Sequence, residues 1–339
     1  MDAILQIEEE RMLEEAGFHK PYLIDRLKAG RNNRVYEIVD EANSKAVLKR
    51  YFHHSGDQRD RLKHEWKFLT YAENCAAEFV PKLLARKDQS RVALLEFIEG
   101  KNFKVEVGGA EIDSAISFVE ALNGEHRMKL GKSLPVAAEA CFAVRDHIEL
   151  MRKRLEKVSS INDERVGCFV ANQLLPIARM AENALLEGSW KYEENVVEDR
   201  LISPSDFGFH NAIDRGMGEV CFIDFEYAGW DGAAKLICDF FSQPQVCVSE
   251  AHLPNFVDAV GKMISAKSEN ILLNNLPGLL LLHGVKWCCI LLNEFSEVDA
   301  SRREYSGDWR IKGKENRDMQ FRKVERYFNK KCLPRVNAF

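Results

Sequence analysis

The chain has 339 residues, of which 46% are hydrophobic and 30% charged, with 20 Gly and 9 Pro. That composition is ordinary for a globular protein and excludes a collagenous, low-complexity or largely disordered chain. The net charge of −5 excludes the strongly basic field that holds long nucleic acids. Residues 300–339 carry 12 Lys or Arg against 5 Asp or Glu. We interpret this basic end as a solvated helix face, with an RNA or membrane contact as the alternative.

The nine cysteines are odd in number and include no C-x-x-C pair. We therefore expect reduced, buried thiols in a cytoplasmic protein rather than disulfides or a zinc site. The first ten residues are acidic and do not resemble a signal peptide. The most apolar stretch, 271–292, contains Pro277, His283 and Lys286. These residues favour a buried core helix starting near Pro277 over a membrane span.

The predicted elements change character near residue 100. A helix over 2–16 is followed by short strands over 22–27, 35–39 and 46–52, a helix over 58–75, and strands over 82–85 and 92–98. Further helices are predicted over 110–123, 137–157, 165–187, 251–265, 278–296 and 314–330, with strand-like segments at 200–202, 210–213 and 220–225. We predict an α+β chain of two lobes, a small β-sheet lobe over 1–99 and a larger, mainly helical lobe over 100–339.

The strongest chemical signal lies around two strand-like segments of the second lobe. Asp206 and Asn211 precede a turn-rich stretch, 214–219, and Asp224 follows it. A hairpin over this stretch would make Asn211 and Asp224 neighbours. An amide oxygen beside a carboxylate suits Mg²⁺, and Asp206 at the lip of the site could orient an acceptor hydroxyl and take its proton. His210, next to Asn211 in the expected strand, is predicted to point to the opposite face and to be structural.

The D-x-x-x-x-N spacing and the downstream D-F-E resemble the catalytic core of the aminoglycoside phosphotransferase and choline kinase family, whose fold is protein-kinase-like. The resemblance covers nearly the whole chain, because other landmarks follow in the family's order: a nucleotide-covering loop at 29–36, a lysine strand at 46–49, an acid on the next helix and a hinge at 94–100. One difference is that Pro204-Ser205 replaces the His-Gly that commonly precedes the aspartate. We expect that difference to affect the bracing of the loop more than its chemistry.

The resemblance implies ATP as phosphoryl donor, Mg²⁺ as cofactor, and a role for each matching residue. Asp206 is the implied catalytic residue, and Asn211 and Asp224 are the implied metal ligands. The implied nucleotide-binding residues are Gly30, Arg31, Asn32, Asn33, Val35, Val47, Lys49, Glu65, Glu96 and Ile98. Lys49 shares a strand face with Val47, and Glu65 lies beside the buried stripe of its helix, so we expect these two charges to pair.

The acceptor pocket is marked less clearly. Two segments combine aromatic and acidic residues, and we predict acceptor contacts from Trp230, Asp231, Trp287 and Glu294. They would suit a polar, cationic or sugar-like acceptor. For Trp287, which lies in an apolar helix, core packing is the competing interpretation.

The predicted function is ATP-dependent phosphoryl transfer to a hydroxyl of a small molecule such as a sugar, an amino-alcohol or an aminoglycoside. A catalytically weak nucleotide-binding pseudokinase or scaffold is the alternative. A protein kinase is a further one, disfavoured because no A-P-E-type signature or activation segment follows Asp224. The acceptor, the choice of ATP over GTP and the oligomeric state stay open at this point.

Overall fold

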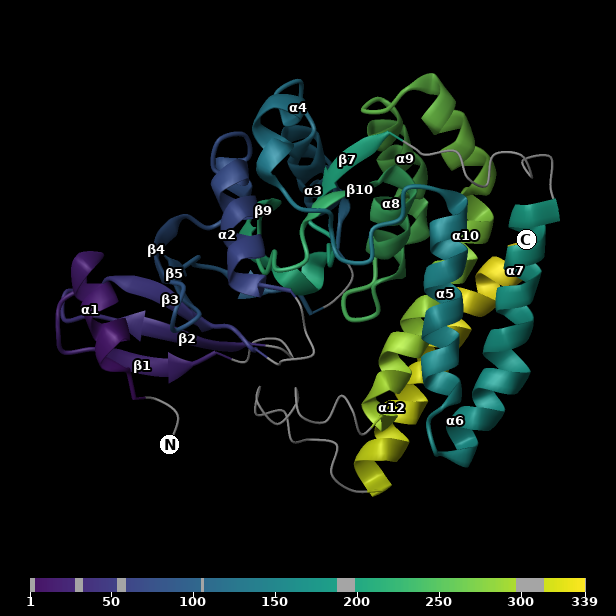
Figure 1. Cartoon of the computed structure of the whole chain (residues 1–339), viewed down its shortest axis with the longest axis horizontal. Helices are drawn as coiled ribbons and strands as arrows, with labels where there is room; N and C mark the ends of the chain where they lie inside the picture. The colour runs from purple at the N-terminus through teal and green to yellow at the C-terminus, as the bar shows by residue number, and fades with distance from the viewer. Residues whose placement is uncertain are drawn as a thin grey trace.

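The computed structural model describes residues 4–27, 33–53, 59–104, 107–187, 199–296 and 314–338. Its first lobe is an antiparallel sheet with the strand order β1-β2-β3-β5-β4 (Figure 1). The strands are β1 (Leu23–Arg26), β2 (Arg34–Val39), β3 (Lys45–Arg50), β4 (Leu83–Lys87) and β5 (Val92–Glu96). Each strand predicted for this lobe is confirmed, although β3 and β5 each end two residues earlier than expected and β4 ends two residues later.

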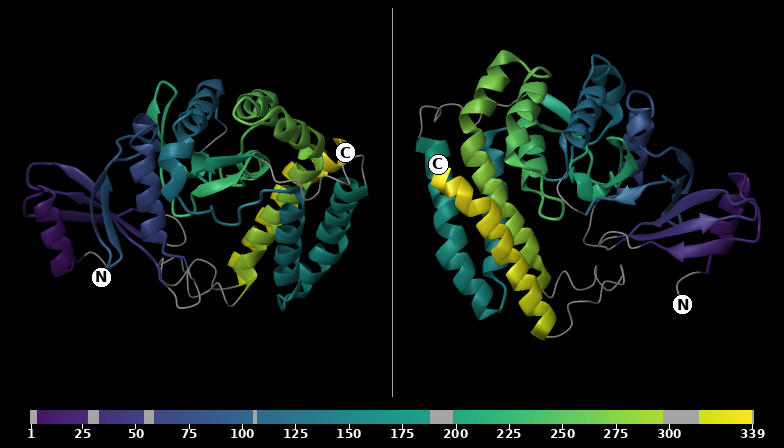
Figure 2. Two further views of the ribbon diagram at one scale, coloured as in Figure 1. Left: turned by 45° about the horizontal axis from the view of Figure 1, so that its top comes forward. Right: turned by 180° about the vertical axis from the view of Figure 1, so that it is seen from behind.

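The two faces of this sheet are covered by different helices, α1 (Ile7–Glu15) and α2 (Arg61–Ala72) (Figure 2). Leu48 and Leu94 share a small core with α1. Leu95, the next residue along β5, belongs instead to the large core that α2 joins. The split follows from the alternation of side chains along a strand. It ties one face of the small lobe to the core of the rest of the protein.

The second lobe is mainly helical. Its longer helices are α3 (Gly109–Leu122), α5 (Val144–Ser159), α7 (Leu175–Glu187), α8 (Ala233–Ser242), α9 (Leu253–Gly261), α10 (Ala266–Leu292) and α12 (Lys314–Tyr327). Shorter ones are α4 (Arg127–Leu130), α6 (Glu164–Phe169) and α13 (Leu333–Ala338). Helices α5, α7, α8 and α12 pack around α10 (Figure 1). Six of the nine cysteines are buried, and all nine are free thiols.

Helix α10 begins earlier than the sequence predicted. Its N-cap is Ser265, whose side chain accepts a hydrogen bond from the backbone of Ser268, and Pro277 lies inside the helix rather than at its start. The expected start was wrong because packing on several sides holds the helix together across the proline. Among the described residues α10 passes the length and hydropathy test for a membrane span, but 83% of its most apolar window is buried in the protein. It is therefore a core helix.

Two small sheets complete the second lobe and carry the site. One contains β6 (Lys101–Asn102), β8 (Ala212–Gly216) and β9 (Glu219–Phe222); the other contains β7 (Arg200–Ser203) and β10 (Gly229–Gly232). The hairpin predicted around 214–219 is confirmed by the antiparallel pairing of β8 with β9. The strand expected at 210–213 was wrong in part, because residues 209–211 form a short 3₁₀ turn and β8 begins at Ala212.

Helix α8 was absent from the predicted elements. All ten of its residues are buried, so the run shows no alternation between a polar and an apolar face. The helix nevertheless matters for function, because two of the charged side chains described below project from it.

Candidate active site

The structure brings Lys49 of β3 and Glu65 of α2 together. Their Nζ and Oε2 atoms lie 2.7 Å apart, and the two residues are 5% and 1% exposed. Tyr51 donates its hydroxyl hydrogen to the same Oε2 at 2.7 Å, and the backbone N–H of Phe225 donates to Oε1 at 3.2 Å. Glu65 is thus held from both lobes, which fixes the position of the Lys49 ammonium.

Lys49 makes a second ion pair, 2.6 Å from Oδ1 of Asp224. Burial alone would lower the pKa of Lys49, but the carboxylates of Asp224 and Glu65 outweigh it and raise that pKa well above its ordinary value. The lysine is therefore cationic at neutral pH and can neutralise anionic groups next to it.

Asp206 follows β7 in a tight loop, where Ser205 has a positive φ of 64°. Asn211 closes this loop, because its Nδ2 donates to the backbone oxygen of Asp206 at 3.0 Å and contacts its Oδ2 at 3.4 Å. The other carboxylate oxygen of Asp206 lies 3.3 Å from Nε2 of His210. Burial would raise the pKa of Asp206, but His210 lowers it below its ordinary value. The carboxylate is therefore ionised, as a proton acceptor must be.

The contact between His210 and Asp206 corrects the expectation that this histidine points away from the site. The expectation assumed a strand, in which neighbouring side chains alternate, whereas the 3₁₀ turn directs the imidazole back to Asp206. The family histidine before the aspartate is replaced here by Pro204, and His210 contacts Asp206 from the other side of the loop.

The hairpin places Asn211 and Asp224 on neighbouring backbone segments, since the N–H of Ile223 donates to the carbonyl oxygen of Asn211 at 2.9 Å. The Asn211 amide nitrogen is used on Asp206, which leaves the amide oxygen for a ligand. Within the described residues no cluster of three or more His, Cys, Asp or Glu side chains forms a metal cage. One amide oxygen and one carboxylate are a donor set of the kind that Mg²⁺ uses when water and phosphate supply its other ligands.

A second interlobe contact, which we name the Glu226 latch, consists of Asn33, Arg61 and Glu226. Asn33 Nδ2 donates to Glu226 Oε2 at 2.7 Å, and Arg61 forms a close ion pair with Oε1. Glu226 is fully buried, Arg61 is 3% and Asn33 5% exposed. Asn33 Oδ1 accepts from the backbone N–H of Phe52 at 3.2 Å. The side chain of Asn33 is therefore committed to the latch, and the sequence interpretation missed both Arg61 and Glu226.

The other nucleotide-binding candidates lie on or beyond the sheet. Val35 is paired with Lys49 across β2 and β3, and Val47 precedes Lys49 by two residues, so both share its face of the sheet. Glu96 ends β5, and Ile98 follows it, both half-buried. Gly30, Arg31 and Asn32 lie outside the described residues.

The structure gives the acceptor candidates different surroundings. Asp231 is fully buried, and its Oδ1 accepts from the backbone N–H groups of Cys141 and Gly232 at 3.0 and 2.9 Å. Trp230 donates its indole N–H to the Gly131 carbonyl at 3.0 Å. These bonds assign Asp231 and Trp230 to holding the backbone around β10.

The two later candidates lie at the C-terminal end of α10 and just beyond it. Trp287 is half-buried and packs against the large core, and its indole nitrogen has no hydrogen-bond partner among the described residues. Glu294 is 7% exposed. Contact with an acceptor stays a prediction for all four residues.

A buried group of charged side chains centres on Asp239 of α8, and the sequence interpretation did not identify it. Asp239 Oδ1 lies 2.9 Å from His283 Nδ1 and also accepts from Lys286 Nζ, while Oδ2 accepts from Lys235 Nζ at 2.7 Å. We call these four residues the Asp239 cluster, and each is at most 6% exposed. The available signal was the presence of charges inside otherwise apolar helices, four residues apart in α8 and three apart in α10.

The charges of the Asp239 cluster follow from its surroundings. Burial would raise the pKa of Asp239, but Lys235 and Lys286 hold it well below its ordinary value. Burial lowers the pKa of His283 to about 4, with Lys286 acting in the same direction. His283 is therefore neutral at pH 7, and its Nε2 lies 2.9 Å from Nδ1 of His147.

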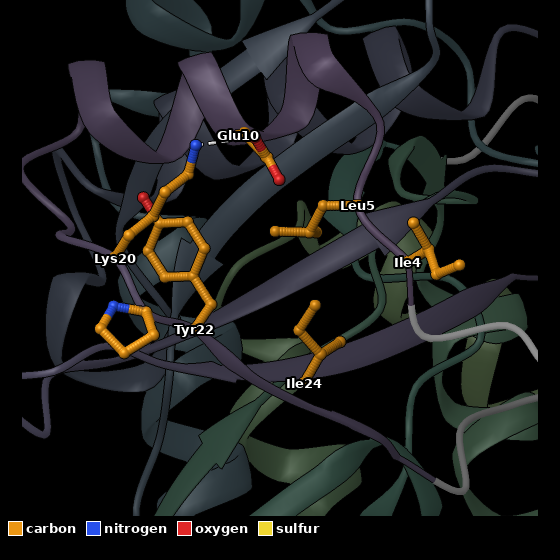
Figure 3. Close-up of a pocket in the computed structure, with 7 residues that line it drawn as sticks. Ile4, Leu5, Glu10, Lys20, Tyr22 and Ile24 are labelled. Atoms are coloured by element: carbon orange, nitrogen blue, oxygen red, sulfur yellow. Dashed lines mark hydrogen bonds and ion pairs between the residues drawn. The ribbon is translucent and has the colours of Figure 1, made fainter.

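Surface pockets do not mark this site. A hollow of about 580 Å³ lies on the small lobe beside α1 and β1, where Lys20 and Glu10 pair above Leu5 and Ile24 (Figure 3). A second, of about 470 Å³, adjoins the start of α5 and includes Glu139, Cys141 and Arg154. Neither hollow is lined by Lys49, Asp206 or Asp224, so these two hollows play no part in the catalytic assignment.

The model of one protein family, the phosphotransferase enzyme family, matches residues 24–243, nearly two thirds of the chain. The match includes Lys49, Glu65, Asp206, Asn211 and Asp224. No curated protein matches the sequence.

Solved structures share the fold at low sequence identity. A choline kinase from Streptococcus pneumoniae matches with a TM-score of 0.55 and 14% identity, over 89% of this chain and 98% of that one. A choline kinase from Cryptosporidium parvum matches with a TM-score of 0.54 and 13% identity, over 98% and 99% of the two chains. The streptomycin–ATP–APH(2″)-IIa ternary complex matches with a TM-score of 0.53 and 15% identity, over 85% and 90%. These similarities establish the two-lobed kinase-like fold.

Proposed function

Because the chain belongs to the phosphotransferase enzyme family, we propose that it transfers the γ-phosphoryl group of ATP to a hydroxyl group of a small molecule. The observation that carries the proposal is the convergence of Lys49, Glu65 and Asp224 across the two lobes, with Asp206 and Asn211 on the adjoining loop. A neighbour of the same fold is a ternary complex with ATP and streptomycin. A cytoplasmic location, where ATP is plentiful, is part of the proposal.

Each of these five residues has one task in the proposed reaction. The Lys49 ammonium, oriented by Glu65, binds the α- and β-phosphate oxygens of ATP. Asp206 accepts the proton of the acceptor hydroxyl. The hydroxyl oxygen forms a bond to the γ-phosphorus, and the bond from that phosphorus to the β,γ-bridging oxygen breaks to release ADP. Asn211 and Asp224 would hold Mg²⁺, which when bound supplies positive charge next to the phosphate oxygens. The protein thus acts mainly by positioning groups and neutralising charge.

Two other functions are less well supported. A pseudokinase would bind nucleotide without transferring phosphate, yet the complete set of Lys49, Glu65, Asp206, Asn211 and Asp224 is retained and brought together. A protein kinase would need an activation segment after the metal-binding aspartate. Here the chain passes from Asp224 to β10 at Gly229, with four residues in between.

The test is phosphoryl transfer from γ-labelled ATP, with GTP in parallel, to a panel of hydroxylated small molecules. We expect Asp206→Asn to lower kcat by about 10²- to 10⁴-fold, the usual contribution of a general base. Asp224→Asn should leave less than about a tenth of kcat, because a charged metal ligand is lost. Asp258→Asn is the matched control, since Asp258 is exposed and pairs with the exposed Lys262. Nucleotide binding without transfer to any acceptor would support the pseudokinase instead. Full activity of Asp206→Asn would show that Asp206 is not the proton acceptor.

A further inference from the structure

We propose that Lys286 selects an anionic acceptor. The hydroxylated molecule that reaches Asp206 carries an oxyanion, either a carboxylate or a phosphate group, and Lys286 binds this group. The inference rests on the proposed function, since it concerns the acceptor of that reaction. It replaces the cationic or neutral acceptor that Trp230, Asp231, Trp287 and Glu294 suggested.

The Asp239 cluster borders the catalytic loop. Phe207, the neighbour of Asp206, stacks on Phe240, the neighbour of Asp239, with ring centroids 4.9 Å apart. The next residue of the loop, Gly208, is equally close to the end of α8, because a Cβ added there would lie 3.4 Å from Cγ of Gln243. Asp239 raises and Lys286 lowers the pKa of Asp206, as expected for charges that lie near one another.

The carboxylate of the cluster, Asp239, and the adjoining carboxylate of Asp231 have used their hydrogen-bonding capacity. Asp239 accepts on both oxygens, from two donors on Oδ1 and one on Oδ2. Asp231 accepts two backbone N–H groups on Oδ1, and its Oδ2 lies 3.4 Å from Lys235. Neither carboxylate is available to pair with a cationic acceptor.

The two lysines of the cluster differ in how many of their N–H donors have a hydrogen-bond acceptor. Lys235 Nζ contacts two carboxylates, Asp231 and Asp239. Among the described residues Lys286 Nζ has one hydrogen-bond acceptor, Asp239 Oδ1, although an ammonium group carries three N–H donors. Lys286 is therefore the buried charge beside the catalytic loop that has donors left for a ligand. Buried ammonium donors are best satisfied by oxyanions, which also balance their charge.

The first experiment compares acceptors that differ only in charge, using the wild-type chain. The matched sets are D-gluconate, glucose 6-phosphate and sorbitol, and D-glycerate, glycerol 3-phosphate and glycerol, with choline as the cationic probe. We expect kcat/KM for an anionic member to exceed that of its neutral counterpart by at least tenfold, and the carboxylate and phosphate arms identify which oxyanion is bound. A preference for sorbitol, glycerol or choline would overturn the inference.

The second experiment removes the charge. Lys286→Met should raise KM for the preferred anionic acceptor by at least tenfold, leave KM for ATP within twofold, and reduce the advantage over the neutral counterpart to near one. Lys262→Met is the matched control, because Lys262 is an exposed lysine paired with Asp258. Lys286→Arg retains a cation and should recover part of the preference, which a purely structural lysine would not explain. If Lys286→Met does not fold, the arginine variant and the wild-type comparison still decide the outcome.

Binding measurements separate this inference from the proposed function. Calorimetric titration with gluconate and sorbitol, in the presence of ADP and Mg²⁺, reports recognition without turnover. Binding of gluconate that depends on Lys286, with no phosphoryl transfer to any acceptor, would sustain the anion site and overturn the phosphotransferase activity. Transfer to neutral acceptors with no effect of Lys286→Met on KM or on binding would do the reverse.

Discussion

Two buried ion networks lie near the loop of Asp206, and they are built in different ways. On the nucleotide side, Lys49 and Glu65 of the small lobe meet Asp224 of the large lobe. On the acceptor side, the Asp239 cluster connects α8 to α10 within the large lobe alone. The first network can form only when the two lobes pack together, whereas the second is part of one helical core.

The difference indicates what each network does. Glu65 accepts hydrogen bonds from Tyr51 in its own lobe and from Phe225 in the other, so it couples the phosphate-binding lysine to the metal-binding segment. The Asp239 cluster contains two lysines, one carboxylate and a neutral histidine. Lys235 also contacts the carboxylate of Asp231, so Lys286 is the lysine with a single carboxylate partner among the described residues. We infer that the nucleotide-side network aligns the donor and that the acceptor-side network selects by charge.

The largest expected effect is on turnover, from the nucleotide side. Lys49→Ala and Glu65→Ala should each lower kcat/KM by about a hundredfold, about 2.7 kcal/mol of transition-state stabilisation. Because Glu65 acts by holding Lys49, the double variant should lose much less than the product of the two single losses. The measurement is a double-mutant cycle on kcat/KM for ATP, at a saturating concentration of the acceptor.

Full additivity in that cycle would show that the two side chains act independently, against the 2.7 Å contact between them. Lys87→Ala, which removes an exposed lysine paired with Glu15, serves as the control and should leave kcat/KM unchanged. If Lys49→Ala alters KM for ATP while Lys286→Met alters KM for the acceptor, the two networks serve different substrates.

The second effect is on stability, from the acceptor side. The pKa of His283 falls to about 4 in the folded protein, from about 6.5 in an unfolded chain. Between those values the unfolded chain binds the extra proton, so stability is complete above about pH 6.5 and is lost as the pH falls towards 4. The full difference between the two pKa values corresponds to a loss of about 3 kcal/mol in the free energy of unfolding. Urea unfolding from pH 7.5 to 4.5 measures it.

His283→Asn should flatten this pH profile, because asparagine keeps a donor for Asp239 but does not titrate. His19→Asn is the control, since His19 is exposed and should leave the slope unchanged. An equal slope in wild type and His283→Asn would mean that other groups cause the acid sensitivity, with His147, also buried and with its pKa lowered, as the next to replace.

The two networks also differ in how far the sequence could predict them. Asp206, Asn211 and Asp224 were identified from their spacing around an expected hairpin. Lys49 and Glu65 were identified from the family resemblance, with support from strand alternation and helix periodicity. These features depend on local backbone geometry, which a sequence pattern encodes directly. The structure places all five in one region, as the pattern implied.

Other features depended on details that no local pattern carries. His210 was assigned to the wrong side because a 3₁₀ turn replaced the expected strand. The helix that holds Lys235 and Asp239 was missed because it is buried all round. Asn33 and Glu226 are 193 residues apart in the chain, so their hydrogen bond appears only once the two lobes are packed. Pairings of this kind are set by tertiary register, which periodicity does not determine.

The smallest expected effect comes from the Glu226 latch, and it tests whether the nucleotide side acts through the packing of the lobes. Asn33 lies in the expected nucleotide-covering loop, immediately before β2, and its amide donates to Glu226, two residues beyond Asp224. Asn33→Ala removes this hydrogen bond and the one that Asn33 accepts from the backbone of Phe52, and leaves the Arg61–Glu226 ion pair in place. A hydrogen bond to a charged group contributes about 1.5 kcal/mol or more, so KM for ATP should rise roughly tenfold. KM for the acceptor should change less than twofold, because the Asp239 cluster is not touched. Asn274→Ala, at an exposed position of α10, is the control. Both KM values are measured well below the melting temperature of the variant. An equal rise in the two would show that the latch stabilises the whole protein rather than aligning the nucleotide.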